Sequence, residues 1–480
     1  MTDSWKFVFS PEEQMLLREK LFSLLEEKGV RMDHPKILQI LGKSGALVDM
    51  STKQVRFPRD LMEGLIDEIP KKVLLAAPDP RFDLEIPHPG GGFYVRTGTG
   101  APGYLNPEDN THGRTQLKDV RTWARVVGAL EHIDFCAFPS PVDVPGKIAD
   151  IYALREMLLN SPKHIWVQPY SGESIEYLFK MAELAAGGAA KLAERPLVSF
   201  ITCSLTPLDY KFMDLEVILQ ACTRGVPLHA CSLPSAGGTA PVTMPGTVLI
   251  AAAEVLVLLA VAQAVKPGTP GVATPLIFTM DMLTGRSLQG SVEAIQGAAA
   301  AVNFLKSTFG IPVHTYGFGA DSPNMDGQAQ SERCLLSLMA ALAGSDIIGG
   351  AGQVEVATTI SPLQLIVDND LAGMVRRLKG GMPVNEETLA WDTLLKIKPG
   401  DHFLNEDHTL MHCRNSFNPR TFIRQSRETW IKKGQADLFS KANDIYNDIM
   451  TKEHPHFLSE TVQREMDNLV KTAEKQLLQG

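Results

Sequence analysis

Residues 313–369 constrain the fold of this 480-residue chain more than any other stretch. They begin with a short β-like run, His314 to Phe318, which breaks at Gly319 into a polar loop, Asp321 to Gln328. A helix-patterned segment rich in Leu, Met and Ala follows, and then a second apolar run, Asp346 to Ile348, leads into a glycine-rich loop. This order of strand, loop, helix, strand and loop is typical of a β/α barrel, in which chemistry collects at the C-terminal ends of the strands.

The same alternation extends over most of the chain from Thr115 to Gly380. Strand candidates separated by helical segments lie at 133–138, 164–170, 197–204, 228–232, 275–280, 313–318 and 346–348. An open doubly wound sheet would usually show a nucleotide-binding fingerprint after its first strand, and this sequence has none. We therefore expect an α/β fold with a TIM-like β/α barrel, whose eighth strand lies between Phe93 and Leu105 or after Gly380.

The flanking regions have a different character from the alternating part. Residues 1–114 predict an α-rich N-terminal cap with a β excursion, in which Ser10 caps a helix that begins at Pro11 and ends at Gly29. We assign residues 115–400 to the barrel and residues 401–480 to a polar connection followed by helices.

Charge and cysteine usage exclude some classes of function. A net charge of -9 without any long basic run argues against a nucleic-acid surface, which needs clustered Lys and Arg. The six cysteines contain no CxxC pair, as is usual for reduced thiols. The N-terminal residues lack the basic and then apolar pattern of a secretory signal, so we expect a cytoplasmic protein.

The run from Thr247 to Val265 is long and apolar enough to cross a bilayer. Glu254 and Gln263 interrupt it, it is rich in Ala, and it has no flanking positive charge. We therefore interpret it as a barrel helix packed on both the sheet and a subunit neighbour. This interpretation also predicts a homo-oligomer.

Several strand candidates alternate in a way that predicts which side chains face the barrel interior. Trp166 and Tyr170 share one face of their strand, Tyr316 and Phe318 share one face of another, and His229 lies on a third. Faces of Trp and Tyr attract cations, and a box of aromatic rings is a common way to hold a quaternary ammonium. The alternative is that these rings belong only to the hydrophobic core.

Other chemistries have weaker support in the sequence. Lys163 precedes its strand, so it does not stand where a Schiff-base lysine would be needed. His229, Cys203 and Cys231 could contribute to a zinc site, but their spacing is not a metal signature, and we expect structural burial and no metal. The polar residues between Asp321 and Glu332 are readily explained as helix caps. No catalytic residue can be assigned.

Three segments carry a resemblance to a known family: GFGADSPNMDGQAQSE, ALAGSDIIGGAGQVE and SPLQLIVDN, with HTLMHCRNS further along. Together they resemble the trimethylamine methyltransferase family, in an order that extends over nearly the whole chain, and in particular its members without pyrrolysine. The resemblance implies a β/α barrel that transfers a methyl group from a methylated amine to the Co(I) of a separate corrinoid protein docked over the barrel mouth. It does not identify the residue that replaces pyrrolysine.

The resemblance and the aromatic strands together predict a methyltransferase acting on a small quaternary amine, with glycine betaine favoured and dimethylglycine as product. Proline betaine, carnitine or another quaternary amine is the alternative substrate, and a non-catalytic betaine-binding barrel is the alternative class. No cofactor is expected on this chain, since the corrinoid (cobalamin) belongs to the partner. The substrate carboxylate would be held by His229, Gln353 or a backbone amide between Gly349 and Gly352. The candidate substrate-binding residues are Tyr94, Tyr104, Trp166, Tyr170, His229, Tyr316, Phe318 and Gln353.

Overall fold

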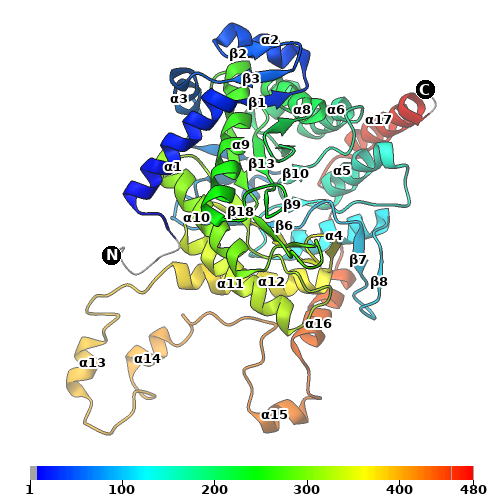
Figure 1. Cartoon of the computed structure of the whole chain (residues 1–480). Helices are drawn as coiled ribbons and strands as arrows, with labels where there is room; N and C mark the ends of the chain where they lie inside the picture. Colours follow the sequence, from blue (N-terminus) through cyan, green and yellow to red (C-terminus); the bar gives the residue numbers. More distant parts are fainter. Residues whose placement is uncertain (1–7, 456, 479–480) are drawn as a thin grey trace.

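Eight parallel strands form the centre of the computed structural model, which describes residues 8–455 and 457–478 (Figure 1). In chain order they are β6 (Tyr94–Thr97), β9 (Cys136–Ala137), β10 (Ile165–Val167), β11 (Val198–Cys203), β13 (Leu228–Ser232), β15 (Gly271–Pro275), β18 (His314–Tyr316) and β19 (Ile347–Ala351). Strands β9, β10, β11, β13 and β15 form one sheet, and β18, β19 and β6 form a second. Single parallel bridges, Arg96 to Phe135 and Ala273 to Val313, connect the two sheets at both edges.

The order of neighbouring strands therefore follows the order of the chain around a ring, as a β/α barrel requires. Strand β6 is the eighth strand that the sequence left open, and it fits the first of the two expected positions. It precedes residue 115, so the ring begins within the segment assigned to the N-terminal cap.

The strands expected at 133–138, 164–170, 197–204 and 313–318 are shorter in the structure, and two others differ more. The strand expected at 275–280 was wrong, since β15 ends at Pro275, and residues 278–280 form β16 in a separate small sheet. Residues Gly271 to Pro275, of which the expected strand contained only Pro275, pair in register with β13. Strand β19 continues through Gly349 to Ala351, beyond the expected end at Ile348.

Helices cover the ring on the outside. In chain order they are α4 (Leu117–Ala129), α5 (Ala149–Asn160), α6 (Ile175–Ala186) with the short α7 (Ala189–Glu194), α8 (Phe212–Arg224), α9 (Met244–Val265), α10 (Val292–Phe309), α11 (Gly327–Leu342) and α12 (Pro362–Lys379). The side chains of Ser291, Asp326 and Ser361 accept backbone N–H bonds at the first turns of α10, α11 and α12. These caps fix where each helix begins after its loop.

The apolar helix α9 is the one helix in the described part of the chain with the length and composition to cross a membrane, and most of it is buried inside the protein. Its inner side contacts β13 and β15. Its outer side contacts three N-terminal helices: α1 (Pro11–Ser23), α2 (Pro35–Ser44) and α3 (Arg59–Asp67). Glu254 on α9 accepts hydrogen bonds from Ser204 and Ser232, which offsets the cost of burying its charge. The chain's own N-terminal region thus covers the surface that we had expected a subunit neighbour to cover.

The N-terminal region packs against the flank of the barrel (Figure 1). Ser10 caps α1 as expected, and the helical stretch ends at Gly29, which has a φ of 69°. The π-helical turn η1 (Leu24–Lys28) separates α1 from that glycine. Strand β1 (Val30–Met32) pairs with β3 (Gln54–Arg56), which pairs with β2 (Leu47–Asp49), and β1 also pairs with β12 (Asp209–Tyr210) from the segment after β11.

Shorter elements occupy the ends of the ring. They are β4 (Val73–Leu75), η2 (Pro80–Phe82), β5 (Leu84–Ile86), β7 (Gly103–Leu105), β8 (His112–Arg114), η3 (Gly146–Ile148), β14 (Ser235–Ala236), β16 (Phe278–Met280), β17 (Ser287–Leu288), β20 (Gln353–Val354) and β21 (Thr359–Ile360). Strands β20, β21, β7 and β8 form one sheet, and β14, β16 and β17 form another.

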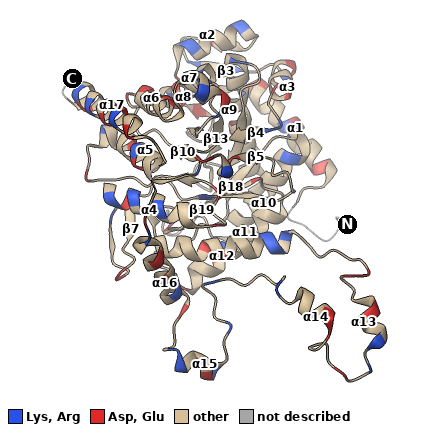
Figure 2. Cartoon of the chain, turned by 180° about the vertical axis from the view of Figure 1, so that it is seen from behind, with Lys and Arg blue, Asp and Glu red and all other residues tan. Residues whose placement is uncertain are grey.

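The C-terminal region first leaves the barrel and then returns to it (Figure 1). Residues 380–437 carry the short helices α13 (Trp391–Lys396), α14 (Asp407–His412) and α15 (Arg427–Lys432). Helix α16 (Leu438–Thr451) returns against α12 and α4, and α17 (Glu460–Leu478) lies on α5 and α6. The sequence from Glu428 to Ile449 predicts one continuous helix, but Gly434 and Gln435 adopt positive φ and divide it into α15 and α16. Acidic and basic residues are interspersed over the outer helices (Figure 2).

Candidate functional site

Four large polar or aromatic side chains meet at one level inside the ring. The Arg96 guanidinium carbon lies 4.2 Å from the centroid of the Trp166 ring. The ring centroids of Trp166 and His229 are 6.0 Å apart, and those of His229 and His314 are 5.7 Å apart. Arg96 Nε donates to His314 Nε2 at 3.4 Å, which completes the circuit. These residues come from β6, β10, β13 and β18, the alternate strands that supply one layer of side chains in a β/α barrel.

A second group lies toward the C-terminal ends of the strands. Tyr316 is two residues beyond His314, and a Cβ atom at Gly350 would lie 3.1 Å from its ring and 3.2 Å from Gln353 Oε1. Gln353 packs directly against Gly98, and Gln289 packs directly against Gly319. Glycines at these places let the two amide side chains approach the backbone closely. We call the two groups together the interior site, which consists of Arg96, Trp166, Tyr170, His229, Gln289, His314, Tyr316 and Gln353.

The interior site concentrates polar atoms that lack a partner. Among the described residues, 11 buried side-chain nitrogen and oxygen atoms make no hydrogen bond, and nine of them belong to this site. They are Arg96 Nη2, Trp166 Nε1, Tyr170 OH, His229 Nδ1 and Nε2, Gln289 Nε2 and Oε1, His314 Nδ1 and Gln353 Oε1. Buried polar groups are normally paired, so a cluster of this kind indicates a place built to bind something polar.

The charge of the interior site is that of Arg96. Its side chain is fully buried, and no Asp or Glu in the described parts of the chain forms an ion pair with it. Burial lowers the pKa of Arg96, and Nη1 donates to the Thr97 carbonyl at 2.8 Å. Burial and then the nearby Arg96 charge hold the pKa values of His229 and His314 well below the usual range, so both imidazoles are neutral at pH 7. The site is therefore positive overall.

The phenol of Tyr316 is also protonated at pH 7. Burial raises its pKa above the usual value, although the positive charge of Arg96 acts in the opposite direction. Neutral imidazoles and a neutral phenol can each donate or accept a hydrogen bond, but none of them is an acid strong enough to protonate an amine at neutral pH.

A second fully buried arginine, Arg333 on α11, holds the loops that carry the interior site. Its guanidinium pairs with Asp368 at 2.8 Å, and both side chains are fully buried. It also donates to the carbonyl oxygens of Phe318 at 2.6 Å and Gln353 at 2.8 Å, while Asp368 accepts from the Gly352 amide at 2.7 Å. Arg333 and Asp368 therefore fix the loops after β18 and β19 relative to each other.

The carboxylate side chains of the polar loop after β18 and of the start of α11 accept hydrogen bonds from nearby backbone amides. Asp326 caps α11, and Asp321 accepts from the backbone amides of Gln289 at 2.6 Å and Gly290 at 3.0 Å. Glu332 accepts from the Asp321 amide at 2.7 Å. The helix-capping interpretation of this loop is confirmed for Asp326, and Asp321 additionally places Gln289 at the mouth.

The structure brings together most, but not all, of the predicted site residues. The predicted alternation is confirmed by the contact of Trp166 with His229 and of His229 with His314. Tyr170 and Phe318 are buried in the segments that follow β10 and β18, or nearly so in the case of Tyr170, whose ring centroid lies 6.0 Å from that of Phe138.

Two predicted residues lie elsewhere. Tyr94, at the first residue of β6, packs 4.9 Å from His88 at the opposite end of the ring from the mouth. Tyr104 belongs to β7, outside the ring, where it lines a surface cavity with Tyr446. Tyr104 read as a mouth residue because the chain from Phe93 to Leu105 looked like a single flexible excursion, whereas only β6 enters the ring.

Sequence reasoning missed Arg96 and Gln289. Arg96 is the one charged residue in a short apolar strand, Tyr94–Thr97, and that is the signal that could have revealed it. Its guanidinium covers a face of Trp166, so that ring face is already occupied by a cation of the protein itself. The same guanidinium carbon lies 6.0 Å from the centroid of the Tyr316 ring, so a ligand ammonium can use only the ring surface that Arg96 leaves free, which is larger on Tyr316 than on Trp166.

Lys163 and the cysteines considered as possible metal ligands lie in the packed interior of the protein. Lys163 is buried and donates from Nζ to the carbonyl oxygens of Val127 at 2.9 Å and Leu130 at 2.5 Å, so it ties α4 to the ring. No group of three His, Cys, Asp or Glu residues in the described ranges is arranged to hold a metal ion. Cys203 and Cys231 lie side by side on paired strands.

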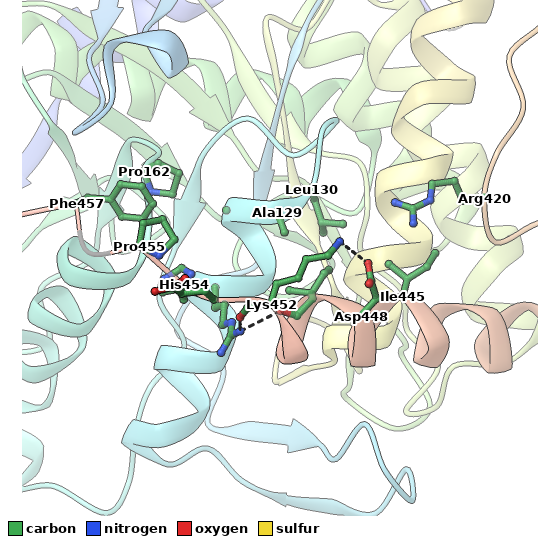
Figure 3. Close-up of a pocket in the computed structure, with 14 residues that line it drawn as sticks. Ala129, Leu130, Pro162, Arg420, Ile445, Asp448, Lys452, His454, Pro455 and Phe457 are labelled. Atoms are coloured by element: carbon green, nitrogen blue, oxygen red, sulfur yellow. Dashed lines mark hydrogen bonds and ion pairs between the residues drawn. The ribbon is translucent and has the colours of Figure 1, made fainter.

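A surface cavity of about 280 Å³ lies between the end of α4, helix α16 and the segment before Phe457 (Figure 3). Lys452 pairs with Asp448 at 2.6 Å, and Arg125 donates to the carbonyl oxygens of Ile449 and Met450. These charged groups already have partners, and they lie outside the ring. The cavity therefore belongs to the packing of the C-terminal region and not to the interior site.

Comparison with known proteins identifies the family. The sequence profile of trimethylamine methyltransferase (MTTB) matches residues 4–477. A trimethylamine methyltransferase MttB from Desulfitobacterium hafniense is 30% identical over 97% of this chain and 94% of its own length. A glycine betaine methyltransferase from the same species is 27% identical over 89% of this chain and 88% of its own length.

Among solved structures, the monomethylamine methyltransferase MtmB from Methanosarcina barkeri superposes with a TM-score of 0.52 over 94% of both chains, at 13% sequence identity. That likeness supports the β/α barrel. The profile match over almost the whole chain shows that this protein is a methyltransferase of the trimethylamine methyltransferase family.

Proposed function

We propose that this protein transfers a methyl group from a small quaternary amine, with glycine betaine favoured, to the Co(I) of a separate corrinoid protein. Dimethylglycine is the second product. The observation that carries the proposal is the interior site, in which a buried guanidinium and unpaired neutral polar groups lie beside aromatic rings. Such a site suits a molecule with one anionic end and one large, weakly hydrated cationic end.

The chemistry of the leaving group supports a quaternary donor. Co(I) attacks the methyl carbon and forms a Co–C bond, while the electron pair of the broken C–N bond stays on nitrogen. A quaternary amine then leaves as a neutral tertiary amine, and no proton has to be supplied. This agrees with the neutral state of His229, His314 and Tyr316. The protein contributes positioning and exclusion of water.

The corrinoid belongs to the partner protein in this proposal, and this chain carries neither a cofactor nor a metal of its own. The partner docks over the C-terminal ends of the strands, where a methyl group held by the interior site would be reached. We also propose a cytoplasmic homo-oligomer. The exposed apolar side chains of residues 380–437, including Trp391, Leu395, Leu404 and Leu410, support self-association.

Proline betaine, carnitine or another quaternary amine is the alternative donor. Relatives named for trimethylamine and for glycine betaine match this chain at similar identity, so sequence identity does not select one substrate. A betaine-binding barrel without turnover is the alternative class. The buried amides Gln289 and Gln353 and the neutral histidines would serve binding and catalysis equally well.

The test is methyl transfer to reduced cobalamin, either free or on its carrier protein. The expected result is methylcobalamin and dimethylglycine from glycine betaine, with essentially no methylcobalamin from trimethylamine. Proline betaine, carnitine and choline assayed in parallel identify the donor. Comparable rates with trimethylamine would contradict the mechanism, whereas betaine binding without any turnover would favour the binding barrel. The purified protein should show no cobalt and no corrinoid absorption.

A further inference from the structure

We infer that Arg96 is the anchor for the substrate carboxylate, so that the methyl donor must be a zwitterion carrying both a carboxylate and a trimethylammonium group. This inference rests on the proposed function, and it narrows quaternary amines to betaines. It also moves the expected carboxylate contact from the Gly349–Gly352 loop to the side-chain layer below it.

The first argument compares the partners of the Arg96 guanidinium with those of the other buried charged side chains. Arg333 has Asp368, Lys163 has backbone carbonyl oxygens, and Glu254 has hydroxyl groups and a backbone amide. Arg96 has one backbone carbonyl, one imidazole nitrogen, the face of Trp166 and the neutral Tyr316, whose ring centroid lies 6.0 Å from its guanidinium carbon; its Nη2 makes no hydrogen bond. Burying a cation without a counter-ion is costly, so the missing anion is expected to come from a ligand.

The second argument is the set of polar groups packed around Arg96. Gly349 faces it from β19, and a Cβ atom there would lie 2.9 Å from Arg96 Nη2 and 2.5 Å from His314 Nε2. Glycine therefore lets the guanidinium and the imidazole pack directly against the β19 backbone. His229 and His314 add three unpartnered ring nitrogens nearby. A carboxylate can accept about four hydrogen bonds, so a guanidinium and neutral imidazoles together match its acceptors.

The third argument concerns orientation. A guanidinium in a water-excluded site repels a ligand ammonium, so the two ends of a betaine must lie at different levels. With the carboxylate at the level of Arg96, the ammonium lies toward Tyr316 and Phe318, nearer the C-terminal strand ends. That places the methyl groups on the side from which a partner protein can approach. Quaternary amines without a carboxylate, such as choline and tetramethylammonium, meet the repulsion and gain nothing from Arg96.

The experiment measures ligand binding by calorimetry for the wild type, Arg96→Gln and the control Arg377→Gln. Arg377 lies exposed on α12, so the control makes the same chemical change outside the ring. The ligands are glycine betaine, proline betaine, carnitine and choline. We expect the wild type and Arg377→Gln to bind at least one betaine more than tenfold tighter than choline. Arg96→Gln should weaken binding of that betaine at least tenfold and leave choline binding unchanged or improved.

A second variant separates a ligand-binding role from a structural one. Arg96→Met removes an uncompensated charge, so the ligand-free protein should melt at the same or a higher temperature than the wild type, and a betaine should no longer raise that temperature. Equal betaine affinity in Arg96→Gln and the wild type would overturn the inference. So would wild-type protein that binds choline as tightly as every betaine, or that binds none of them. Betaine binding through Arg96 without methyl transfer would instead overturn only the proposed function.

Discussion

Arg96 and Arg333 are both fully buried in the same barrel, but their surroundings differ. Arg333 makes a 2.8 Å ion pair with Asp368 and donates to three backbone carbonyl oxygens, so its hydrogen bonds join a helix and two loops. Arg96 has no carboxylate partner among the described residues and leaves Nη2 unpaired. The difference teaches that burial alone does not define a role. A paired buried charge organises structure, whereas an unpaired one marks a binding function that reduces stability.

The largest effect should follow removal of Arg333. Arg333→Met leaves the Asp368 carboxylate buried without a partner and releases both mouth loops. We expect the free energy of unfolding to fall by about 3–5 kcal/mol. Urea denaturation measures it, with Arg96→Met as the matched comparison and an expected change near zero. Similar losses in the two variants would remove the distinction between the two arginines.

The contrast extends to the histidines, because His164 has partners on both ring nitrogens, whereas His229 has none. Burial lowers the pKa of His164 from 6.5 to about 4, so the folded protein binds this proton more weakly than the unfolded chain. The contribution of His164 to the free energy of unfolding is therefore fully present above pH 6.5, and it is lost as the pH falls toward 4. The full loss corresponds to about 3 kcal/mol.

The measurement is the pH dependence of unfolding for the wild type and His164→Gln between pH 7 and 4. The difference between the two proteins should shrink as the pH falls. Taking the difference cancels the buried Asp150 and Asp214, whose pKa values burial raises to about 6 and which act in the opposite direction. Parallel curves would show that His164 does not titrate as its burial implies.

A smaller effect should follow from adding a side chain beside Arg96. Gly349→Ala places a methyl group against Arg96 Nη2 and His314 Nε2, so both side chains must move from the positions in which they would hold the carboxylate. We expect betaine affinity to fall at least tenfold, or about 1.4 kcal/mol. Gly64→Ala on α3 is the control, since a Cβ atom there meets nothing within 4 Å. Undiminished affinity in Gly349→Ala would place the carboxylate away from Arg96.

The smallest effects should come from the aromatic rings near the mouth. Tyr316→Leu and Phe318→Leu should each weaken betaine binding by about 0.5–2 kcal/mol through loss of cation–π attraction. Trp166→Leu should act differently, because Arg96 lies 4.2 Å from the centroid of its ring, compared with 6.0 Å for the ring of Tyr316. The affinity for choline distinguishes the two rings. Tyr316→Leu should weaken choline binding, and Trp166→Leu should not. Calorimetry with both ligands shows whether the two levels of the site are distinct.

Local patterns predicted the periodic parts of this molecule. The strand that begins at His314 and the loop that caps α11 were predicted because alternation and capping depend on neighbours in sequence, although β18 ends at Tyr316 and not at Phe318. Strand β6 could be placed only as one of two alternatives, because four residues between glycines are too few for alternation to be visible. Arg96 could not be paired with Trp166 or His314, since closure of the ring brings them together across more than 200 residues in the case of His314. The sequence also could not reveal that α1, α2 and α3 cover α9.

The most direct test of the account is a structure of the protein with glycine betaine bound. We predict a carboxylate oxygen within about 3.2 Å of Arg96 Nη2, and the trimethylammonium group displaced from it toward Tyr316 and the C-terminal ends of the strands. A carboxylate held by the amides of Gly349–Gly352, with the ammonium against the rings at the level of Trp166, would contradict the account.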